Sequence, residues 1–98
     1  MKKEIKVTNI LRDIHQLLVS NGAADWSKTI NNFEISWESA NSDEERKEIA
    51  RRILSIYGGM GSFSDLVLFR EMKVLIKENE YLDELRRELY NEALATIR

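Results

Sequence analysis

The feature that most constrains this fold is a glycine-rich stretch in the middle of the chain. Residues 57–66 read Tyr-Gly-Gly-Met-Gly-Ser-Phe-Ser-Asp-Leu and hold three of the four glycines, in a chain of 98 residues without proline. Glycine adopts backbone conformations that other residues avoid, and it destabilises the interior of helices and strands. The stretch therefore predicts a loop that separates two regular, apolar parts of the chain.

Apolar residues on both sides of this loop recur at steps of three and four, the period of an amphipathic α-helix. The spacing predicts four helices, over about residues 5–20, 25–39, 43–57 and 80–97. The expected fold class is mainly α. We expect one domain, residues 1–98, in which about four main helices form a bundle with a glycine-rich loop and a short irregular or extended segment.

Local signals mark the ends of these helices. The run Ser20-Asn21-Gly22 would end the first helix, because Asn and Gly accept the left-handed backbone conformation. Ser42 and Glu45 have the spacing of a capping box at the start of the third helix. Asn79 is the predicted N-cap of the last helix, since its side chain could accept a hydrogen bond from a free backbone N–H.

Residues 66–76 are ambiguous. Two short apolar runs flank Arg70-Glu71-Met72-Lys73. A short helix and two short extended segments both fit, because short apolar runs do not distinguish the two structures. We favour irregular or extended structure here.

Both tryptophans fall on one predicted helical face, at steps of four, three and four residues with Ile30 and Phe33 between Trp26 and Trp37. Large aromatic rings usually anchor a core, because each buries a large apolar surface. We expect both in the core. The alternative is that one tryptophan lies at the rim and contacts a partner.

Composition excludes several classes of protein. The chain has no cysteine, so it has neither disulfides nor thiolate metal sites. A net charge of −2 argues against a general nucleic-acid binder, which needs a basic face. No apolar run is long enough for a membrane span, and no signal peptide is evident at the start. We expect a cytoplasmic protein.

The sequence offers little for catalysis. His15 is the only histidine, and it lies beside an apolar stripe, where a boundary position is the simpler explanation. A phosphate-binding P-loop needs lysine after its last glycine, but Gly61 is followed by Ser62 and Phe63. We expect no catalytic residue, no metal and no cofactor. A small enzyme that uses His15 remains a third, weaker hypothesis.

The glycine-rich loop is a candidate contact surface, because loops on a rigid scaffold often carry recognition. Gly58 or Gly59 would end the preceding helix, and Ser62 or Ser64 would cap the segment that follows. Asp65 could accept hydrogen bonds from loop amides. Carboxylates also gather at the start of the third helix, where the helix dipole favours them and where a cationic partner could bind. The candidate partner-binding residues are Asp43, Glu44, Glu45, Glu48, Met60, Ser62, Ser64 and Asp65.

The segment 57–68 resembles the signature of a family of small bacterial helical proteins, with the pattern Gly-Gly-Met-Gly-Ser-Phe-x-Asp-Leu. Residues 78–90 and the helix after Asp25-Trp26 are similar to that family as well. Two departures stand out: the family more often has Asn at position 64, and it tends to have a glycine-containing turn at residues 70–73.

Small proteins similar to this one occur as immunity proteins of bacterial toxin systems, including contact-dependent inhibition. The resemblance implies a non-enzymatic protein that binds the C-terminal domain of a cognate toxin, often a nuclease, and covers its active site or substrate groove. The acidic residues could then mimic phosphates. The alternative is a helical DNA-binding or regulatory module, for which the best basic cluster is Arg46, Lys47, Arg51 and Arg52. A homo-oligomer is compatible with either function.

Overall fold

The computed structural model describes residues 2–98, and the side chains from residue 6 onward. Its helices are α1 (Lys2–Ser20), α2 (Ala24–Ser39), α3 (Asp43–Ser55) and α4 (Ile76–Ile97), and its strands are β1 (Phe69–Arg70) and β2 (Lys73–Val74). A single 3₁₀ turn, η1 (Phe63–Asp65), lies between α3 and β1. The predicted mainly α fold is therefore confirmed. No helix in the described part of the chain is long and apolar enough to cross a membrane.

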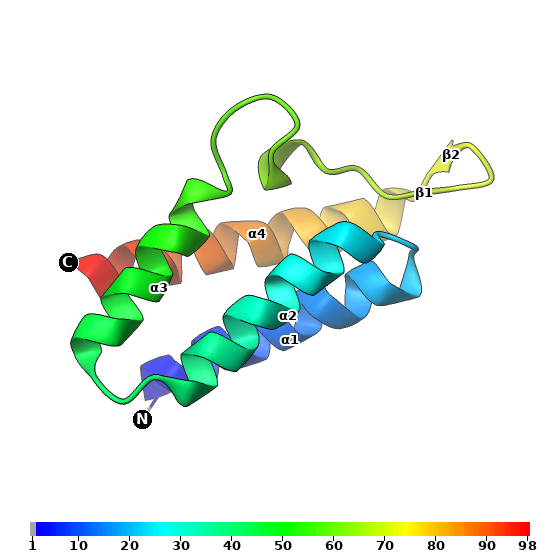
Figure 1. Ribbon diagram of the computed structural model, residues 1–98. Coiled ribbons are helices and arrows are strands. Elements are labelled where there is room, and N and C mark those ends of the chain that lie inside the picture. The colour runs from blue at the N-terminus through cyan, green and yellow to red at the C-terminus, as the bar shows by residue number, and fades with distance from the viewer. Residues whose placement is uncertain (1) are drawn as a thin grey trace.

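Successive helices run in opposite directions, as Figure 1 shows, with α1 packed against both α2 and α4 and with α3 packed against α4. The bundle is elongated, with extents of 44 × 24 × 20 Å. The glycine-rich loop rises from the end of α3, and the β-hairpin projects at the end of the bundle where α4 begins (Figure 1). Loop and hairpin are consecutive in sequence and form an extended segment alongside α4.

The core is a stripe of aliphatic side chains from all four helices, closed by two residues of the loop segment. Phe63 and Leu68 come from the segment between α3 and α4, and both are buried. The buried hydrophobic residues of the helices are Val7, Ile10, Leu11, Ile14, Leu18, Ile30, Trp37, Ile49, Ala50, Ile53, Leu82, Leu85, Leu89 and Ala93. The helical periodicity therefore identified the faces that pack together.

The signals at the helix ends act largely as predicted. Gly22 has φ +76° and lies two residues after the end of α1 at Ser20. The Ser42 hydroxyl accepts a hydrogen bond from Glu45 N at 3.2 Å. The Glu45 carboxylate accepts from Asn41 N at 3.4 Å, one residue earlier than in the usual capping box. At the other end, α3 stops at Ser55, two residues before the predicted boundary.

The predicted extended structure in residues 66–76 is confirmed as an antiparallel hairpin, in which Phe69 pairs with Val74 and Arg70 pairs with Lys73. The two-residue turn has positive φ at Glu71 (+52°) and Met72 (+66°). Two-residue hairpin turns need this backbone conformation, which Asn and Gly usually supply. The hairpin is therefore built with strained residues at its tip.

The predicted role of Asn79 is wrong. Helix α4 begins at Ile76, so Asn79 lies inside its first turn. Its side-chain amide instead binds the base of the hairpin: Oδ1 accepts from Leu68 N at 2.8 Å, and Nδ2 donates to the carbonyls of Leu68 (3.0 Å) and Leu75 (2.8 Å). Leu75 N also donates to the Leu68 carbonyl at 3.0 Å. The amide therefore bridges the two groups of this pair that do not bond each other directly, Leu68 N and the Leu75 carbonyl.

Replacing Asn79 with alanine should destabilise the protein by about 2 kcal/mol, because it leaves the backbone N–H of buried Leu68 without a partner. Chemical denaturation followed by circular dichroism measures this loss. The matched control is Asn91→Ala, an exposed change on the same helix. Equal stability of the Asn79 and Asn91 variants would show that the side-chain amide does not hold the hairpin.

Candidate functional site

The glycine-rich loop is held in one conformation by hydrogen bonds within it. Gly59 (φ +88°) and Gly61 (φ +74°) both have left-handed backbone conformations. The Asp65 carboxylate accepts from Gly61 N at 2.9 Å, as predicted from the sequence. The backbone of Phe63 returns to α3 and donates to the Ile56 carbonyl at 2.9 Å. The loop is therefore a closed turn over the end of α3.

The two loop serines do not cap the segment that follows, which corrects the expectation from the sequence. Ser62 precedes η1, but its side chain makes no capping hydrogen bond. Instead the hydroxyls of Ser62 and Ser64 both donate to the Tyr57 carbonyl, at 3.3 and 2.5 Å. That carbonyl lies just beyond the end of α3, where a helix leaves such groups without partners. The serines therefore complete the end of α3.

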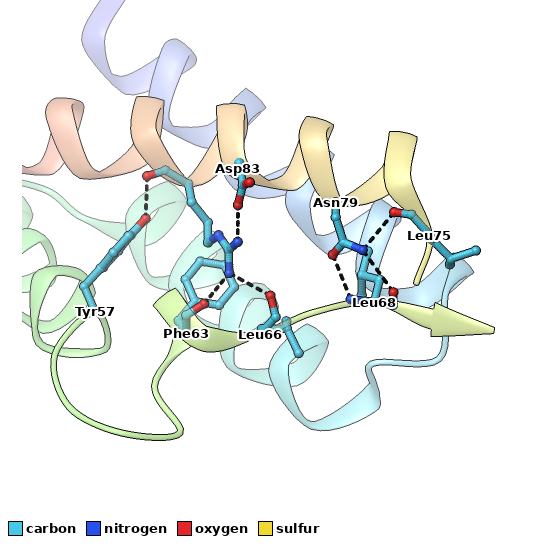
Figure 2. Close-up of polar contacts among 8 residues, drawn as sticks. Tyr57, Phe63, Leu66, Leu68, Leu75, Asn79 and Asp83 are labelled. Carbon is cyan, nitrogen blue, oxygen red and sulfur yellow. Dashed lines mark hydrogen bonds and ion pairs between the residues drawn. The ribbon is translucent and has the colours of Figure 1, made fainter. Parts of the chain in front are cut away.

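Arg86 of α4 forms hydrogen bonds with the residues that follow the glycines of the loop (Figure 2). Its Nη1 donates to the carbonyls of Phe63 (2.6 Å) and Leu66 (3.0 Å), and its Nη2 pairs with Asp83. The guanidinium lies 5.7 Å from the centre of the Phe63 ring, a favourable cation–π distance. Arg86 is not among the candidate residues chosen from the sequence. No sequence pattern would have identified Arg86 as the anchor.

Aromatic rings surround this anchor. Phe63 is fully buried between Trp26 and Tyr57, with ring centres 5.2 and 5.6 Å away. The Tyr57 hydroxyl donates to the Arg86 carbonyl at 2.7 Å. Burial raises the pKa of the Tyr57 phenol far above its usual value of 10.0, and the nearby Arg86 charge offsets this only in part. The phenol therefore stays protonated and keeps donating its hydrogen bond.

The hairpin leaves an apolar face uncovered. In a strand, alternate side chains point to opposite faces, and paired residues share a face. Leu68 is buried, whereas Phe69 and its partner Val74 are each about half exposed, at 54% and 52%. Val67 and Ile76 continue this exposed set on either side. An antiparallel sheet usually presents polar residues to water, so this apolar face is unusual.

A groove of about 390 Å³ borders the same strand. Its walls come from the start of α2, the glycine-rich loop and the residues that lead into β1: Trp26, Gly61, Asp65, Leu66, Val67 and Phe69. Trp37 is buried in the core as predicted, whereas Trp26 is only partly buried and forms one wall. Trp26 therefore lies at the edge of the core, which corrects the expectation that both tryptophans are buried within it.

The acidic candidates lie elsewhere, at the first turns of α3. Exposed carboxylates there pair with cations one turn along the same helix: Asp43 with Arg46 (3.2 Å), Glu44 with Lys47 (3.7 Å) and Glu48 with Arg51 (3.3 Å). Helix α3 has 13 residues and is about 20 Å long, and the loop follows its opposite end. The structure therefore separates the eight candidates into an acidic group and a loop group.

Stability should fall as the pH rises above about 10, because Tyr57 ionises more readily in the unfolded chain than in the folded protein. The contribution of Tyr57 is fully present below that pH and is lost above it. Thermal unfolding measured on either side of pH 10 should show this decline in the wild type and a shallower one in Tyr57→Phe. Identical slopes in the two proteins would contradict the assignment.

A family model for a domain of unknown function (DUF6966) matches residues 19–76, from the end of α1 to the first residue of α4. The matched region contains α2, α3, the glycine-rich loop and the hairpin. No curated protein and no solved structure matches the chain. More than half of the sequence lies within the match, and the chain belongs to the DUF6966 family.

Proposed function

We propose that this protein is a non-enzymatic immunity protein, which binds the C-terminal domain of a cognate bacterial toxin in the cytoplasm and neutralises it. The observation that carries this proposal is the glycine-rich loop. Hydrogen bonds of Asp65, Ser64 and Arg86 fix its backbone, yet its central residue Met60 is fully exposed. The resemblance of residues 57–68 to the glycine motif of small bacterial proteins supplies the kind of partner.

A loop with these properties suits protein recognition. Binding orders loops and side chains, and that ordering costs affinity unless the free protein is already in the bound conformation. Here the hydrogen bonds of Asp65, Ser64 and Arg86 set the conformation in advance. The glycines leave backbone amides accessible, and an exposed methionine adapts its shape to a partner surface. Met60 would be the central apolar contact.

Electrostatics plays a smaller part than the sequence suggested. Residues 43–52 carry four carboxylates and four cations, and three of the carboxylates are already paired along the helix. Exposed pairs of this kind contribute little energy, so they are easily exchanged for contacts with a partner. In this proposal the acidic end of α3 speeds association with a basic toxin, whereas the loop supplies the affinity.

The alternative of a DNA-binding module gains no support from α3. Three of the four cations in its basic cluster, Arg46, Lys47 and Arg51, pair with these carboxylates, and residues 43–52 carry no excess positive charge. A phosphate backbone is held by such an excess.

The test begins with a pull-down of the tagged protein from its native bacterium, with bound partners identified by mass spectrometry. Stoichiometric recovery of one toxin C-terminal domain, followed by inhibition of that domain by the purified protein, would support the proposal. Recovery of nucleic acid, or of a toxin domain that stays active in the complex, would refute it.

Met60→Asp should weaken binding of that toxin domain roughly tenfold or more, because a charge replaces an apolar contact at the centre of the interface. The matched control is Met72→Asp, which places the same charge on an equally exposed methionine of the hairpin. Isothermal titration calorimetry gives both affinities. If the two variants bind the toxin alike, the loop is not the binding surface.

Glu44→Lys should slow association with a basic toxin domain and leave dissociation nearly unchanged, with a larger effect at low salt. Glu44 is the better choice for this test, because Glu45 also caps α3. Stopped-flow or surface plasmon resonance measures the two rates. Wild-type rates in the variant would remove the acidic end of α3 from the interface.

A further inference from the structure

A cavity of about 270 Å³ lies where the end of α2, the start of α3 and the end of α4 meet. Residues of all three segments form its walls: Trp37, Asp43, Arg46, Lys47, Ala95, Thr96 and Arg98. Pockets that hold drug-sized ligands usually measure ~300–1,000 Å³, so this cavity has room for a molecule of a few non-hydrogen atoms.

The indole of Trp37 brings a hydrogen-bond donor without an acceptor to this cavity. Trp37 is 2% exposed, and its Nε1 is buried with no hydrogen-bond partner. No other buried side-chain nitrogen or oxygen in the described part of the chain lacks a partner. A buried indole N–H normally donates to an acceptor, because an unpaired one loses its hydrogen bonds to water without compensation. An acceptor bound in the cavity would provide that compensation.

Cations on α3 favour an acceptor with a negative charge. Arg46 and Lys47 both line the cavity. The Arg46 guanidinium is held there by the Ala40 carbonyl, at 3.4 Å, and by the Asp43 carboxylate, at 3.2 Å. Lys47 pairs with Glu44 at 3.7 Å, and an exposed pair of this kind contributes little energy. The Lys47 ammonium can therefore exchange this contact for one with a ligand.

The walls also limit the charge that such a ligand can carry. Asp43 lines the same cavity, and its carboxylate repels a dianion more strongly than a monoanion. A carboxylate carries one charge on two acceptor oxygens, which suffices for one bond from the Trp37 indole and one from the Lys47 ammonium. Ala95 and the Trp37 ring offer apolar surface to the remaining carbon atoms.

We propose that this cavity binds a small organic carboxylate, with the Trp37 Nε1–H and the Lys47 ammonium as its donors and the Arg46 guanidinium as a neighbouring positive charge. The ligand would join three helices at the end of the bundle away from the hairpin, which adjoins the opposite end of α4 (Figure 1). This binding goes beyond the proposed toxin contact and makes no use of the glycine-rich loop.

Nuclear magnetic resonance of the indole N–H tests the proposal directly. The chain has two tryptophans, so Trp26→Phe leaves the signal of Trp37 as the single indole signal. Acetate, added to the ¹⁵N-labelled protein at constant ionic strength, should shift this signal until it saturates. Acetamide is the matched ligand control, because it has nearly the same shape without the charge, and it should shift the signal far less.

Lys47→Gln should weaken acetate binding roughly two- to fivefold, the effect of losing one partly exposed ionic contact. The matched control variant is Arg51→Gln. Arg51 forms the same kind of pair with Glu48 one turn further along α3, but it does not line the cavity. Circular dichroism checks that each variant keeps its helices.

Several outcomes would overturn the proposal. An indole signal that acetate does not move at any concentration would refute the site. An equal response to acetamide would show that the charge plays no part, and equal weakening by Arg51→Gln would show that only the overall charge of the protein matters. Tighter binding of inorganic phosphate than of acetate would refute the carboxylate as the ligand.

The carboxylate site and the toxin contact can fail separately. The titration uses the protein without any toxin, so its failure would leave the proposed function untouched. Recovery of no toxin domain in the pull-down would count against the proposed function and would leave a saturable acetate shift as it stands.

Discussion

The position of the glycine-rich loop on this protein depends on the contacts of the Arg86 guanidinium. Segment 57–75 has little regular structure of its own, so its backbone carbonyls need partners from elsewhere. Arg86 supplies partners for two of them and places its charge over the ring of Phe63, the residue that carries the loop into the core. Among the described residues no other hydrogen bond links η1 to α4, so Arg86 is the contact that holds the internally bonded loop against the bundle.

Two turns earlier on helix α4, Asn79 holds the neighbouring segment in the same way. Asn79 and Arg86 are seven residues apart and therefore lie on the same face of the helix. Each uses a planar polar side chain to bind backbone groups of the neighbouring segment, Asn79 at the base of the hairpin and Arg86 at the loop (Figure 2). One helix thus acts both as a wall of the core and as the support for loop and hairpin.

The sequence predicted the parts of the fold that depend on local periodicity. The positions of the four helices, the Gly22 stop, the Ser42 cap and the extended structure near residue 70 all follow from short-range patterns. The errors concern groups whose partners are distant in the chain. Asn79 has the composition of an N-cap, but a carbonyl and an N–H eleven residues away compete for its amide. The preference of Asn for helix N-caps reflects only neighbouring residues, so it gives no information about these distant partners.

The candidate site was predicted only in part, for the same reason. The link between Asp65 and Gly61 spans four residues and was visible in the sequence, whereas the bonds from Arg86 to the loop span 20 and 23 residues and were not. The groove beside Trp26 joins three segments that only the tertiary structure brings together. The separation of acidic and loop candidates by the length of α3 was likewise invisible in the sequence.

The attachment of loop and hairpin through two side chains has a consequence for how such a protein can diversify. The aliphatic interior makes no use of residues 58–62 or 70–74, which are exposed or only partly buried. Relatives that keep an arginine and an asparagine seven residues apart on the last helix could therefore exchange these two stretches freely. The bundle would keep its stability while the exposed surface acquires a different specificity.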